Sequence, residues 1–151
     1  MDINKTPAQE LNSYCEELPI INGVLYPDGN YDDMFIFTDK NQKRAVYHSN
    51  TRLQFPFSDN TVYSSIIIQS EIICNDLNCK AVCGEGSYGG DGFVMLESLT
   101  TGKMLWLVSF DNSNPFMSIQ HYENTFIVTN NCNEKWHFDI SDMDNIKISI
   151  N

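Results

Sequence analysis

From Ile20 onward, the chain is a series of short apolar runs rich in β-branched residues, separated by clusters of Gly, Asn, Asp, Ser and Pro. Runs of this kind, bounded by turn residues, are typical of β-strands. Turn clusters at this spacing favour a sandwich or a curled sheet. The pattern therefore predicts a mainly β protein with antiparallel strands, and α+β is the second choice.

The individual strands can be placed from the runs themselves. Residues 62–74 read as one long or bent strand, and Pro56 demotes residues 53–57 to an edge strand or a loop. Turn clusters are expected at residues 27–30, 39–43, 100–103 and 111–115. The remaining strands are expected at residues 20–26, 34–38, 44–48, 80–84, 93–99, 104–110, 119–122, 125–129, 135–140 and 146–150.

One helix is expected, close to the N-terminus, at about residues 7–17. Thr6 can cap it, Pro7 suits the first helical position and Gln9 can close a capping box. The helix should end before Pro19, because the residue preceding a proline avoids the helical region. The length of 151 residues and the absence of a repeat predict a single domain over residues 1–151.

Charge narrows the choice of partner. The sequence has 20 Asp and Glu against 9 Lys and Arg, a formal net charge of −11. Nucleic acid and anionic membranes are bound mainly through Lys and Arg, so neither is expected as a partner. An acidic field attracts a basic protein and speeds its encounter, although acidity can also serve solubility alone.

The sequence also indicates a compartment. It has no apolar run of about 18 residues and no N-terminal signal peptide, so a soluble protein is expected. The number of cysteines, five, is odd, which favours reduced thiols in the cytoplasm over a disulfide framework.

Motifs for chemistry are incomplete. The glycine-rich stretch at residues 84–92 lacks the Gly-Lys-Ser/Thr ending of a phosphate loop and leads into a strand. A calcium loop starting at Asp28 would need Gly where Asp33 stands. Cys79 and Cys83 have no second close pair of zinc ligands, and no Gly-x-Ser-x-Gly elbow is present. We therefore expect a protein that is not an enzyme and has no metal or cofactor.

Loop carboxylates are the expected contact groups, because turns and loops are usually exposed and clustered charges focus a field. They fall into an acidic turn, the glycine-rich loop with its aromatic residue, and a weaker C-terminal group. The predicted partner-binding residues are Asp28, Asp32, Asp33, Glu85, Tyr88, Asp91, Asp139, Asp142 and Asp144.

Small size, strong acidity, many Asn residues and a β-rich pattern without catalytic motifs together resemble bacterial immunity proteins of polymorphic toxin systems, such as contact-dependent growth inhibition. The segments at residues 111–116, 128–131 and 135–140 add a local likeness to small bacterial β proteins. The resemblance implies a cytoplasmic immunity protein that neutralises a cognate basic toxin domain, often a nuclease, by covering its active site with carboxylates. The alternative is a small-ligand binding β domain lined by aromatic residues.

Overall fold

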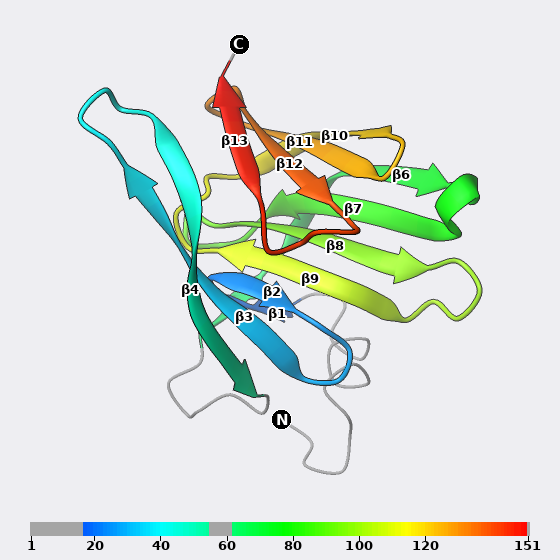
Figure 1. Cartoon of the computed structure of the whole chain (residues 1–151). Helices are drawn as coiled ribbons and strands as arrows, with labels where there is room; N and C mark the ends of the chain where they lie inside the picture. The colour runs from blue at the N-terminus through cyan, green and yellow to red at the C-terminus, as the bar shows by residue number, and fades with distance from the viewer. Residues whose placement is uncertain (1–16, 55–61, 151) are drawn as a thin grey trace.

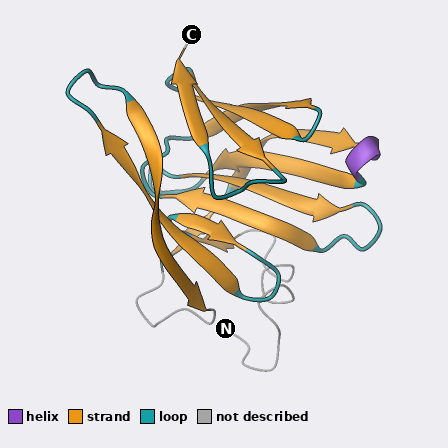
Figure 2. Cartoon of the chain, viewed as in Figure 1, coloured by secondary structure: helices purple, strands orange, loops and turns teal. Residues whose placement is uncertain are grey.

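The computed structural model describes residues 17–54 and 62–150, which form three antiparallel β-sheets (Figure 1). Strands dominate the described part of the chain, and its only helical element is the single 3-10 turn η1 (Asn75–Leu77) (Figure 2). The mainly β class predicted from the turn-bounded apolar runs is therefore confirmed.

The largest sheet has seven strands in the spatial order β4-β3-β2-β9-β8-β7-β6. Each neighbouring pair in it is antiparallel, and β4 and β6 form its two edges. In chain order, its strands are β2 (Gly23–Leu25), β3 (Asn30–Thr38), β4 (Arg44–Gln54), β6 (Ile67–Cys74), β7 (Cys79–Glu85), β8 (Gly92–Ser98) and β9 (Met104–Phe110).

Two smaller sheets cover its faces. The first is a four-stranded meander in which β10 lies against β6, β7 and β8, while β13 lies beside β4 (Figure 1). Its strands are β10 (Phe116–Tyr122), β11 (Thr125–Asn130), β12 (Glu134–Asp139) and β13 (Lys147–Ile150). The second pairs β1 (Glu17–Pro19) with β5 (Tyr63–Ser65) and covers part of the opposite face.

Two hydrophobic cores result from this layering. The larger core lies between the seven-stranded and four-stranded sheets and contains a ring cluster, in which Trp136 contacts Phe110 at 5.4 Å and Phe116 at 5.3 Å between ring centroids. Strand β12 shows strict alternation of buried and partly exposed residues, as expected for a strand with one face on a core. The smaller core packs Leu18 of β1 against Leu107 of β9 and its neighbours.

Several boundaries differ from the sequence prediction. The strand predicted at residues 20–26 is wrong as one element, because the chain turns at Asn22, which has a φ of 52°, between β1 and β2. The run at residues 62–74 divides into β5 and β6, which belong to different sheets. The helix predicted at about residues 7–17 lies outside the described residues except for Glu17, which begins β1.

Strands β3 and β4 are longer than predicted because tertiary pairing outweighs local propensity. Asp32 and Asp33 are poor strand residues, yet β3 contains both, since it pairs with β2 on one side and β4 on the other. As a result, β3 and β4 form a long hairpin whose tip projects beyond the rest of the seven-stranded sheet (Figure 1). No helix in the described part of the chain is long and apolar enough to cross a membrane.

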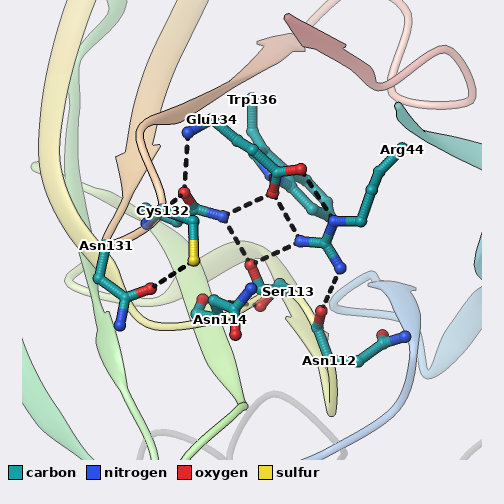
Figure 3. Close-up of polar contacts among 9 residues, drawn as sticks. Arg44, Asn112, Ser113, Asn114, Asn131, Cys132, Glu134 and Trp136 are labelled. Atoms are coloured by element: carbon teal, nitrogen blue, oxygen red, sulfur yellow. Dashed lines mark hydrogen bonds and ion pairs between the residues drawn. The ribbon is translucent and has the colours of Figure 1, made fainter. Parts of the chain in front are cut away.

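A buried ion pair ties this hairpin to the four-stranded sheet (Figure 3). The Arg44 guanidinium donates to both carboxylate oxygens of Glu134, at 2.8 Å and 2.6 Å, and to the carbonyl oxygens of Asn112 and Ser113. Asn130 donates to the same carboxylate at 2.7 Å. These contacts join β4, the loop after β9 and the start of β12, so the hairpin is held against the body of the protein.

Candidate functional site

An acidic loop joins β12 to β13 at residues 140–146. Met143 and Ile146 are buried in the larger core, which anchors the loop at both of these points. Asp144 lies between the two anchors and is exposed. Asp142, just before Met143, is also exposed, and Asp139 is partly exposed. Asp139 is the last residue of β12, and Asp142 and Asp144 follow it in the connection; we name residues 139–146, with these three carboxylates, the acidic loop. Three carboxylates within six residues, with no Lys or Arg among them, form a local negative patch.

A groove of about 380 Å³ lies beside the acidic loop on the outer face of the four-stranded sheet. Asp139 and Asp142 line it together with His137 and Lys147. Hydrogen bonds from the side chain and backbone of Ser141 lower the pKa of Asp139, which stays ionised at neutral pH. Burial and the nearby Lys side chains lower the pKa of His137, so its imidazole is neutral.

The acidic loop also reaches the seven-stranded sheet. His48 Nε2 lies 3.6 Å from Asp32 Oδ1 and 3.7 Å from Asp144 Oδ1. The Asp32 side chain is fully buried, His48 is 21% exposed and Asp144 is 61% exposed. The group therefore runs from the interior of the sandwich to its surface. We name these three residues the Asp–His–Asp cluster.

A β-bulge helps to position this cluster. The register between β3 and β4 shifts between Asp32 and Met34, where Asp33 alone lies opposite residues 49–51, so the extra residues belong to β4. Bulges re-aim side chains and occur often beside functional sites. Asp32 pairs with Val24 in the register, and Val24 belongs to the larger core, so Asp32 faces the four-stranded sheet. Met34 pairs with His48, and this places the imidazole beside the same core.

Metal-ligating atoms converge at this cluster. One oxygen each of Asp32 and Asp144 and one imidazole nitrogen of His48 all lie within 4.8 Å of one another. Among residues 17–54 and 62–150, this is the one group of three or more His, Cys, Asp or Glu side chains that meets this criterion. Cys79 and Cys83, whose spacing was considered for zinc, are buried and free, and so is the nearby Cys74.

The first acidic turn divides into residues with different surroundings. Asp28 is exposed and accepts hydrogen bonds from the backbone and side-chain nitrogens of Asn30, so it shapes the turn after β2. Asp33 is partly buried and accepts a hydrogen bond from Ser49. The expectation that Asp32 is an exposed turn carboxylate is wrong, because it lies within β3 and faces the core.

The glycine-rich loop between β7 and β8 is more ordered by hydrogen bonds than its composition suggested. Asp91 was expected to be exposed, which is wrong: its side chain is buried and accepts a hydrogen bond from the Tyr88 backbone at 3.0 Å. Glu85 ends β7 and is partly buried, while Tyr88 is 63% exposed. Ser64 of β5 accepts a hydrogen bond from Ser87, so this loop contacts the two-stranded sheet.

Sequence reasoning missed two features of the surface. His48 was not singled out, because the residues that surround it come from distant parts of the chain. The outer face of the β3–β4 hairpin also carries three rings, Phe35, Phe37 and Tyr47, each about half exposed. Tyr47 stacks on Phe35 at 5.6 Å and meets Phe37 edge-on at 6.1 Å. We name these three rings the hairpin aromatic patch. Phe35 and Phe37 are two residues apart in a predicted strand, which places both rings on one face, and this spacing was the signal that could have identified the patch.

No known protein family has a model that matches this chain, and no curated protein matches it.

Proposed function

We propose that this protein binds a basic protein partner. It acts as the immunity protein of a cognate toxin domain of the nuclease class, by covering the toxin's active site with carboxylates. The acidic loop is the observation that carries the proposal. Its three carboxylates lie in one short surface segment, and the chain as a whole carries a net charge of −11. Such a field speeds association with a basic surface and selects against acidic ones.

The anchoring of the acidic loop strengthens this proposal. Met143 and Ile146 hold the loop in the core, so its carboxylates are largely positioned before a partner arrives. Pre-organised groups lose less conformational entropy on binding than groups on free loops. The carboxylate of Asp139 is also ionised over a wide pH range, because Ser141 donates two hydrogen bonds to it.

The hairpin aromatic patch favours a protein partner over a small molecule. Exposed aromatic residues that touch one another are enriched at protein interfaces and often carry a large share of binding energy. Phe35, Phe37 and Tyr47 are each about half exposed and lie on a projecting hairpin. Acidic groups would then set the rate of encounter, and rings would add buried apolar area after contact.

The test begins with the reading frames on either side of that of this protein, one of which should encode a basic toxin-type domain; the absence of such a domain from both would count against the proposal. Association and dissociation rates would be measured over a salt series with the wild-type chain and with the variant D139N/D142N/D144N. The matched control is E17Q/D76N/D111N, which removes the same charge at exposed positions outside the acidic loop. We expect slower association for the loop variant, with a difference that shrinks as salt rises.

A second readout is protection from growth arrest when the toxin domain is expressed in the same cells. The proposal predicts protection by the wild type and the control, and weaker protection by the loop variant. Association and dissociation rates that change neither with salt nor with the loop substitutions would refute the electrostatic mechanism. Failure of the wild type to bind or protect would refute the immunity function, and with it the reason for placing the protein in the cytoplasm.

The small-ligand function is the second candidate, and the groove beside the acidic loop favours it. Its volume of about 380 Å³ is in the range of ligand-binding pockets, about 300–1,000 Å³. The polar lining with Lys147 and two carboxylates would suit a polar ligand. Ligand-induced stabilisation in a thermal-shift screen, lost in Lys147→Met, would put this function ahead of toxin binding.

A further inference from the structure

The geometry points to a divalent-cation site in the Asp–His–Asp cluster, formed by one oxygen each of Asp32 and Asp144 and by Nε2 of His48. This inference goes beyond partner binding and does not rest on it. The three ligating atoms already lie within 4.8 Å of one another. They come from β3, from β4 and from the acidic loop, so an ion bound here would join the two main sheets.

The chemistry of the donor set suits a transition-metal cation. As metal ligands, two carboxylates and one imidazole nitrogen together contribute a charge of −2, which a divalent cation neutralises. Calcium takes oxygen ligands almost exclusively, whereas zinc and manganese accept both imidazole nitrogen and carboxylate oxygen. The class of ligand is therefore a zinc-like or manganese-like divalent ion, with water completing its coordination.

The observed distances are close to those that such an ion requires. Zinc binds nitrogen and oxygen at about 2.0–2.2 Å, so two ligands of a tetrahedral ion lie about 3.4 Å apart. The two distances from His48 Nε2, 3.6 Å to Asp32 and 3.7 Å to Asp144, exceed that value by only a few tenths of an ångström. Asp144 is exposed on the acidic loop, so it has room to make the remaining adjustment.

One of the three ligands, Asp32, is more buried than the carboxylates of ordinary surface ion pairs. The Asp32 carboxylate is fully buried on the inner face of the seven-stranded sheet, while His48 is only 21% exposed. The β-bulge after Asp32 brings this carboxylate and His48 to the same place, and Met143 and Ile146 anchor the segment that carries Asp144.

The experiment uses the full chain after treatment with a chelator. Isothermal titration with Zn²⁺ and Mn²⁺ should give one saturable site per chain, with Zn²⁺ bound more tightly, as the general order of metal affinities requires. The Mn²⁺ complex should show nitrogen coupling from an imidazole in pulsed electron paramagnetic resonance. H48Q should remove that coupling.

The variants compare cluster residues with matched neighbours. H48Q and D144N should each weaken Zn²⁺ binding by more than about tenfold, because even outer-shell partners cost about 10–100-fold. H137Q and D142N are the controls, since both residues belong to the groove and lie outside the cluster. Asp32 is left intact, because its burial makes misfolding the expected result of substitution.

Three results would overturn the site. The first is no saturable binding of either ion at about 1 mM. The second is binding that survives both H48Q and D144N. The third is Mn²⁺ bound without imidazole coupling. Circular dichroism of each variant would check that the β fold is retained.

Discussion

Substituting Arg44 by Met would test what holds the β3–β4 hairpin to the four-stranded sheet. Met keeps most of the apolar length of the side chain but removes the guanidinium. Glu134, whose side chain is only 7% exposed, would then lose a two-point ion pair at 2.8 Å and 2.6 Å (Figure 3). The carbonyl oxygen of Asn112 would also lose the Arg44 donor, while that of Ser113 would lose Arg44 but keep its hydrogen bond from Asn130.

The size of the effect follows from burial. Removing one partner of a buried ion pair typically costs about 3–5 kcal/mol, because the remaining charge is left without compensation. The Arg44 side chain is 15% exposed, and Asn130 still donates to Glu134 in the variant, so the lower end of that range applies. We expect a loss of about 3 kcal/mol in the free energy of unfolding at pH 7, equivalent to roughly 6–12 °C in Tm for a protein of this size.

The loss should depend on pH. In the native protein, burial raises the pKa of Glu134, but hydrogen bonds from Arg44 and Asn130 outweigh burial and leave its pKa below the usual value. A carboxylate with a lowered native pKa stabilises the fold above its unfolded-state pKa, and this contribution disappears as the pH falls through the native pKa. Without Arg44, protonation of Glu134 relieves an uncompensated charge. The difference between wild type and variant is therefore largest at pH 7 and shrinks toward about pH 4.

Urea denaturation followed by tryptophan fluorescence is a suitable assay, since Trp136 contacts the Glu134 carboxylate at 3.5 Å. The double variant R44M/E134Q completes a thermodynamic cycle and should recover part of the lost stability. Lys80→Met is the control, because Lys80 forms more exposed pairs at 3.5 Å and 4.0 Å and should cost under about 1 kcal/mol. The prediction would be refuted if Arg44→Met lowered the free energy of unfolding equally at pH 7 and at about pH 4. A coupling energy near zero between Arg44 and Glu134 would refute it as well.

Three further outcomes are expected. In the native state, iodoacetamide should modify exposed Cys132 quickly, and it should modify Cys83 only after unfolding, because burial raises the pKa of the Cys83 thiol to about 12. Equal rates of modification of the two thiols, measured by peptide mass spectrometry, would contradict this prediction. Phe138→Ala should cost about 3–5 kcal/mol in urea denaturation, whereas Phe35→Ala, at a half-exposed ring, should cost under about 1 kcal/mol; comparable losses would mean that the larger core is wrongly placed. Gly84→Ala should lower the Tm sharply, because its methyl group would lie 2.0 Å from a backbone carbonyl oxygen of β6; an unchanged Tm would show that the β6–β7 pair can separate at little cost.

The candidate site shows where local pattern stops being informative. Sequence reasoning placed Asp28, Asp32 and Asp33 in one acidic turn and expected all of them at the surface. The structure leaves Asp28 in the turn but makes Asp32 a strand residue whose carboxylate faces the core. Side-chain direction in a strand depends on which face is covered, and the cover over Asp32 comes from the four-stranded sheet, formed near the other end of the chain.

The sequence by itself determined the β class, most strand positions from β7 onward and the excess of negative charge, because β-propensity, alternation and turn chemistry act over a few neighbouring residues. Tertiary structure alone decided that residues 62–74 divide between two sheets and that Arg44 meets Glu134. It also decided that His48 lies between Asp32 and Asp144, which are distant in the chain. Contacts of this kind, between residues distant in the chain, depend on how the sheets stack to bury apolar area. The packing of whole layers is not encoded in any local run of residues.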